Sequence, residues 1–171
     1  MSAPRAEARR GGARPPVVRV IGPGRNVGKT TLASALIALL AGRGLRVAAV
    51  KRSHHTLPDE RPGSDTDRFA EAGAAAVAFH APDGVLLRRS AEPALEESLH
   101  ALGGGYDLIV VEGFRDDTIG AVIRLDRLGT ARLESEASEP LLATASTDVV
   151  AFADALERLF ALRTAARSQD H

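Results

Sequence analysis

The residues with the clearest chemistry lie in a glycine-rich segment from Gly22 to Thr31, which reads Gly-Pro-Gly-Arg-Asn-Val-Gly-Lys-Thr-Thr. The apolar run Val17 to Ile21 precedes this segment, and the helix-like run Leu32 to Leu40 follows it. A strand, a glycine-rich loop and a helix in this order are typical of a phosphate-binding loop. Backbone amides and the amino end of the helix then face phosphate oxygens. The segment therefore predicts a nucleotide site.

Different side chains of the loop are expected to bind the phosphates and the metal ion. We expect Lys29 to reach the β- and γ-phosphates and the Thr30 hydroxyl to bind Mg²⁺. The chain has two lysines against twenty arginines, and a compact ammonium ion suits a phosphate cradle better than a planar guanidinium. Pro23 stands where the usual pattern has its leading glycine, so the start of the loop is altered. The remaining residues of the predicted nucleotide site are Gly24, Arg25, Asn26, Val27 and Gly28.

An acidic residue follows a second apolar run, Leu108 to Val111. Uniformly apolar strands are typical of sheets covered on both faces, and in doubly wound folds the carboxyl ends of the strands face the ligand. We therefore predict that Glu112 holds Mg²⁺ through water or orients an attacking water. Gly113 would let the backbone pass close to the γ-phosphate. The simpler interpretation is an ordinary strand followed by a surface acid.

Two other polar segments leave alternatives open. His54 and His55 follow Lys51-Arg52-Ser53, and they could contact phosphate or a partner, bind a metal, or belong to a solvated loop. Asp65 could cap a short helix or act as a further magnesium ligand.

Missing residue types limit the chemistry. The only asparagine is Asn26, so the Asn-Lys-x-Asp segment that reads guanine in common GTPases cannot form, and the base is not derivable from the residues. The only glutamine is Gln169, in the predicted tail, so no core glutamine can orient water. We expect at most a slow GTPase.

Composition sets further bounds. Basic and acidic residues number 22 each, which gives no overall field toward nucleic acid or a membrane, and we expect neither as a partner. The chain has no cysteine and no apolar run of about 18 residues, which favours a cytoplasmic protein.

Alternating strand-like and helical patterns predict an α/β, P-loop NTPase-like fold. We expect a mostly parallel sheet with helices on both faces and a small β-hairpin insertion, formed by residues 75–80 and 85–89 around a Pro-Asp-Gly turn. Residues 1–16 would be a disordered basic tail, 17–165 the nucleotide-binding domain and 166–171 a flexible end. The segment 126–140 is short and polar, and no strand is predicted there.

Four segments resemble the MobB-type adaptor proteins of molybdopterin-guanine dinucleotide biosynthesis, within residues 17–125: residues 24–31, 50–55, 65–68 with 72–74, and 107–114. The resemblance implies a GTP-binding P-loop fold, usually dimeric, with weak GTPase activity. It also implies a partner, the molybdopterin guanylyltransferase that joins GMP to molybdopterin. Lys29, Thr30 and Thr31 would bind phosphate and magnesium, and Glu112 would lie on the γ-phosphate side. Arg52 stands where the family usually has the first histidine of Lys-His-x-His-His.

Two other functions use the same loop. A small-molecule kinase would need a lid that supplies arginines, for which Arg88, Arg89 and Arg115 are weak candidates. A nickel-insertion GTPase would use His54 and His55 as metal ligands.

Overall fold

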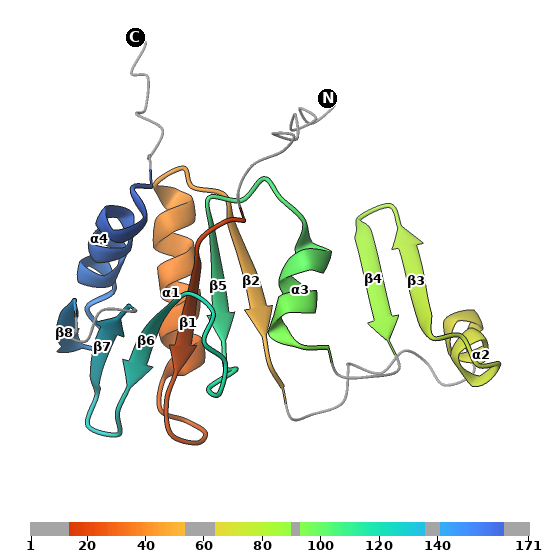
Figure 1. The fold of residues 1–171 in the computed structure, drawn as a ribbon, viewed down its shortest axis with the longest axis horizontal. Helices are drawn as coiled ribbons and strands as arrows, with labels where there is room; N and C mark the ends of the chain where they lie inside the picture. Colours follow the sequence, from red (N-terminus) through yellow and green to blue (C-terminus); the bar gives the residue numbers. More distant parts are fainter. Residues whose placement is uncertain (1–13, 54–63, 90–92, 136–140, 163–171) are drawn as a thin grey trace, which may run out of the picture. The chain divides into compact units, whose positions relative to one another are not determined.

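The computed structural model describes residues 14–53, 64–89, 93–135 and 141–162 (Figure 1). It divides into two compact units. The unit that we call the sheet unit comprises Met1–Arg52 with Leu102–His171, and the hairpin unit comprises Ser53–Ala101. Among the described residues, no helix is long and apolar enough to cross a membrane.

The sheet unit is built on six strands in the order β2-β5-β1-β6-β7-β8. The first four of these strands run parallel to one another, and β7 and β8 add antiparallel pairs. The mainly parallel α/β architecture predicted from the sequence is confirmed. The strands are β1 (Val17–Ile21), β2 (Val47–Lys51), β5 (Leu108–Glu112), β6 (Ala121–Leu125), β7 (Thr130–Glu134) and β8 (Leu142–Ala145).

Helices α1 (Lys29–Gly42) and α4 (Val149–Phe160) lie side by side against this sheet (Figure 1). Leu36 of α1 and Phe152 of α4 are fully buried and belong to one core with Val18 and Val20 of β1. Side chains alternate between the two faces of a strand. The residues of β1 on the other face are buried as well, so both faces of the strand are covered. Strands covered on both faces are almost uniformly apolar, as β1 is.

Strand register brings three parts of the chain to one edge of the sheet. Val20 is aligned with Glu112, and Lys51 of the neighbouring β2 is aligned with Glu112 from the other side. Because these strands are parallel, their carboxyl ends meet at the same edge. The phosphate loop, which follows β1, therefore begins beside Glu112 and Lys51.

The hairpin unit holds the remaining elements. Strands β3 and β4 pair antiparallel around the turn at Pro82 and Asp83, so the predicted hairpin is confirmed. Helix α2 begins at Asp65, but the capping residue is Ser64, whose hydroxyl accepts a hydrogen bond from the Asp67 amide at 3.3 Å. The interpretation of Asp65 as the cap is therefore wrong. The elements are α2 (Asp65–Glu71), β3 (Ala76–Ala81), β4 (Gly84–Arg89) and α3 (Leu95–Leu102).

Strand β7 corrects the expectation for residues 126–140. Ala131 and Leu133 are buried while Arg132 between them is exposed, which is the alternation of a strand with one covered face. The Asp126 carboxylate accepts hydrogen bonds from the amides of Leu128 and Thr130 and so fixes the turn that precedes β7. Charged residues on the exposed face made the segment look like a loop.

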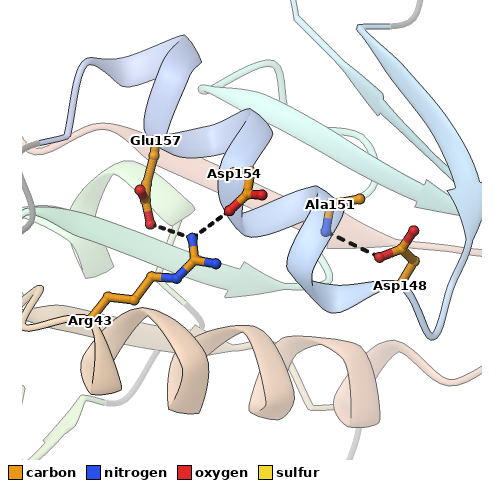
Figure 2. A network of polar contacts seen from close by, with 5 residues as sticks. All are labelled: Arg43, Asp148, Ala151, Asp154 and Glu157. Carbon is orange, nitrogen blue, oxygen red and sulfur yellow. Dashed lines mark hydrogen bonds and ion pairs between the residues drawn. The ribbon is translucent and has the colours of Figure 1, made fainter.

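Arg43 links the ends of the two packed helices. Figure 2 shows its guanidinium reaching from the end of α1 to Asp154 and Glu157 of α4, and one nitrogen lies 2.7 Å from an oxygen of each. These hydrogen bonds, that to Glu157 first, raise the pKa of Arg43 above its usual value. Asp148 caps the start of α4, because its carboxylate accepts a hydrogen bond from the Ala151 amide at 3.2 Å.

We expect Arg43→Ala to lower the free energy of unfolding by about 1 kcal/mol. Water screens these partly exposed ion pairs, and the substitution leaves Asp154 and Glu157 as neighbouring like charges. Urea denaturation measures the change, and the loss should shrink in 1 M salt. Arg127→Ala removes the same charge from an exposed turn and serves as the control. Equal loss in the two variants would contradict the role of the network.

Candidate phosphate and magnesium site

The loop between β1 and α1 has the backbone that a phosphate site requires. Gly28, at the N-cap of α1, has φ +90°, a left-handed conformation that side chains rarely adopt. Gly24 and Asn26 also have positive φ. Among the described residues, no side chain caps α1, and its first turn contains no acid. The amino end of α1 thus offers N–H groups and the positive end of the helix dipole to an anion.

Lys29 crosses the loop, and its ammonium donates to the carbonyl of Gly24. The contact places the positive charge over the loop, at a position that solvent still reaches. Arg115 makes a second contact with the loop, from its Nη2 to the carbonyl of Gly22 at 3.2 Å. Two cations therefore lie beside the loop backbone, where negative charge on a ligand would be stabilised.

Thr30 and Glu112 meet at the side of the loop. The Thr30 Oγ1 lies 2.9 Å from both carboxylate oxygens of Glu112. Only 14% of the Glu112 side chain is exposed, whereas Thr30 is exposed, so solvent reaches the contact from the Thr30 side. Lys51 completes the cluster, with its Nζ 3.2 Å from Glu112 Oε2 and 3.3 Å from Thr30 Oγ1. The sequence predicted the first two residues as neighbours but gave Lys51 no role.

The donor atoms of this cluster fit Mg²⁺. A hydroxyl and a carboxylate are hard oxygen ligands, and magnesium in nucleotide sites is held by one or two side chains together with phosphate oxygens. Among the described residues, no group of three or more His, Cys, Asp or Glu could hold a metal ion alone. Thr30 and Glu112 thus match a magnesium ion that arrives with a nucleotide.

Gly113 lies where two strand ends come close. Its φ is +99°, and a Cβ built on it would be 3.0 Å from the Cβ of Arg52. Its amide donates to the Val20 carbonyl at 3.1 Å, and the Arg52 amide donates to the Glu112 carbonyl at 2.9 Å. A larger residue would push apart the ends of β2 and β5, so the glycine keeps Glu112 in place.

Arg19 is a buried charge that sequence analysis missed. Its Nε donates to the Ile119 carbonyl at 2.8 Å and its Nη1 to the Phe114 carbonyl at 2.9 Å. Burial lowers its pKa from the usual value, and the charge of Asp117 opposes that effect. Arg19 therefore fixes both ends of the loop that follows Glu112 and Gly113. The sequence feature that could have indicated this role is the position of Arg19, a single charge inside the apolar run from Val17 to Ile21.

The remaining predicted residues differ in what the structure says of them. Arg25 and Thr31 are exposed, and Val27 is half-buried, with a methyl group 3.1 Å from a Cβ built on Gly22. Asp65 belongs to the hairpin unit, where its largely exposed carboxylate lies 3.7 Å from Arg68. His54 and His55 lie outside the described residues. The role of Asp65 as a magnesium ligand stays a prediction.

The sheet order, the glycine-rich loop at the end of β1 and the helix that follows it define a P-loop NTPase-like α/β protein. The family model described as "Molybdopterin guanine dinucleotide synthesis protein B" (MobB) matches residues 17–154. The chain belongs to this family.

Curated relatives agree with this assignment. The "Molybdopterin-guanine dinucleotide biosynthesis adapter protein" of Escherichia coli K12 is 33% identical over 101 residues, which cover 56% of this chain and 58% of the relative. The protein of the same name from Haemophilus influenzae is 32% identical over 125 residues, or 70% of this chain and 68% of the relative. A solved structure of Bacillus subtilis MobB is 24% identical to this chain, with a TM-score of 0.49, and the match covers 64% of this chain and 63% of that one.

Proposed function

We propose that this chain binds Mg²⁺·GTP and acts as an adaptor in molybdopterin guanine dinucleotide biosynthesis. The observation that carries the proposal is the contact of Thr30 with Glu112 beside a phosphate loop, 2.9 Å to each carboxylate oxygen, in a chain of the MobB family. The curated relatives are named adapter proteins of this biosynthesis, which supports the same role here.

The chain's own residues would bind the triphosphate in a defined way. Backbone amides from Gly24 to Gly28 and at the amino end of α1 would donate hydrogen bonds to the phosphate oxygens. Lys29 would leave the Gly24 carbonyl for the β- and γ-phosphates, and the Thr30 hydroxyl would turn from Glu112 toward the metal. Mg²⁺, once bound, would offset the phosphate charge. Glu112 would then orient a water at the γ-phosphate side.

Slow hydrolysis fits an adaptor better than a free-standing catalyst. The chain has one glutamine, Gln169, so a water-orienting glutamine like that of fast GTPases is absent from the loop regions. The nucleotide would thus serve a partner, which we propose is a molybdopterin guanylyltransferase. The test measures guanylyl transfer by that enzyme at low GTP, with and without this protein. Equal rates would contradict the adaptor role.

Exposed apolar side chains on the hairpin unit favour an assembled protein. Phe79 and Leu86 face each other across the β3–β4 pair, and both are about half exposed, as are Val85 and Leu87 on the opposite face. Helix α2 adds Phe69, which is 59% exposed. A two-stranded hairpin with apolar side chains on both faces gains stability when another surface covers it. We propose that a second copy of the chain does so.

We expect Phe79→Glu to shift the protein from dimer toward monomer, because a carboxylate in the covered face would lose its hydration. Light scattering coupled to size exclusion gives the mass, and at least a tenfold weaker dimer is expected, about 1.4 kcal/mol. Val150→Glu, at an exposed apolar position of α4, is the matched control. A wild-type monomer at all concentrations would contradict the dimer.

A further inference from the structure

The Lys51 ammonium contacts both side chains that the proposed magnesium site uses. Its Nζ lies 3.2 Å from Glu112 Oε2 and 3.3 Å from Thr30 Oγ1, and those two side chains touch each other at 2.9 Å. The position follows from the backbone, because Lys51 ends β2 and its register aligns it with Glu112 at the end of β5. A protein cation thus contacts the proposed metal ligands.

This arrangement makes the ammonium and Mg²⁺ competitors. Both would use the same hydroxyl and carboxylate, and two cations held by one pair of oxygen groups repel each other strongly. The Lys51 side chain is 57% exposed and flexible, so it can swing away from the cluster. The Glu112 side chain is only 14% exposed, so it is held more closely by its surroundings than Lys51 is.

We propose that Lys51 is a built-in cation that neutralises Glu112 before the nucleotide arrives and that Mg²⁺ displaces when Mg²⁺·GTP binds. The inference rests on the proposed function and extends it to which cation neutralises Glu112 before and after the nucleotide binds. Lys51 is a positioning residue, because it acts through Glu112 and Thr30. The Lys51 ammonium keeps the Glu112 carboxylate from repelling the incoming triphosphate. GTP binding therefore depends less on magnesium.

The test compares the Kd for GTP in excess Mg²⁺ and in excess EDTA, measured by calorimetry for the wild type and for Lys51→Met. Without magnesium, the variant leaves Glu112 uncompensated beside the phosphates, and we expect about tenfold weaker binding. With magnesium, the competing ammonium is gone, and binding should be unchanged or tighter. The ratio of the Kd in EDTA to the Kd in magnesium should therefore be about tenfold larger for Lys51→Met than for the wild type.

Three further variants isolate the cause. Arg158→Met removes one positive charge from an exposed position in the last turn of α4 and should leave the ratio unchanged. Lys51→Arg keeps the charge and should restore binding without magnesium. When Glu112 is already Gln, Lys51→Met should no longer change the ratio, because no carboxylate charge remains to be neutralised.

If the wild type binds GTP in excess magnesium, either of two results would overturn this inference and leave the proposed function intact. Equal weakening of GTP binding by Lys51→Met with and without magnesium would make Lys51 a direct phosphate ligand. No change in either Kd would make its contact with Glu112 irrelevant to binding. Failure of the wild type to bind GTP in excess magnesium would instead overturn the proposed function, and this inference with it.

Discussion

Lys29→Ala is expected to abolish measurable GTP binding, with a loss of at least about a hundredfold in affinity, or about 2.8 kcal/mol. The ammonium of Lys29 lies over the loop at the Gly24 carbonyl, and the chain has only one other lysine. Removing this charge leaves the phosphate oxygens with the backbone amides and with Arg115, the side-chain cation at the Gly22 carbonyl. Calorimetry with Mg²⁺·GTP measures the loss.

Lys29→Arg is the matched variant, because it keeps the charge and changes the shape. A planar guanidinium fits poorly among the oxygens of a β- and γ-phosphate, so we expect little recovery of affinity. Arg158→Ala removes a remote charge and should bind GTP normally. Equal affinity in the wild type and in Lys29→Ala would remove the loop from nucleotide binding.

Glu112→Gln is expected to reduce the slow GTP hydrolysis at least about tenfold while GTP affinity in magnesium stays within about twofold. The carboxylate contacts Thr30 and Lys51 rather than the loop backbone, so its charge acts on the metal or on water. Glutamine keeps the size of the side chain and the oxygen that accepts from Thr30. Single-turnover phosphate release measures the hydrolysis rate.

The thermal unfolding midpoint separates this effect from damage to the fold. Glu112 lies at the end of β5, and its backbone carbonyl, which accepts from the Arg52 amide, is unchanged by the substitution. The midpoint should therefore stay close to that of the wild type. A normal hydrolysis rate in Glu112→Gln would show that another group orients the water, and Glu112 would then act in metal binding alone.

Local patterns in the sequence determined much of the fold. The apolar runs of β1 and β5, the glycine-rich loop and the helix after it were all predicted, because a strand or helix covered by a core needs a continuous or periodic apolar pattern. The hairpin was predicted from its Pro-Asp-Gly turn. Strand β7 was not, because its exposed Arg132 and flanking charges obscured a face of only two buried residues.

The composition of the site was also visible in the sequence, but its connections were not. The types and spacing of Lys29 and Thr30 indicate phosphate chemistry by themselves, since the loop and the helix that position them are local. Lys51 and Glu112 are far apart in the chain, and only the parallel pairing of β2 with β5 aligns them. Arg19 likewise reaches Phe114 and Ile119 only after the sheet has formed. Non-local strand register, which no local pattern encodes, therefore decided which charges meet.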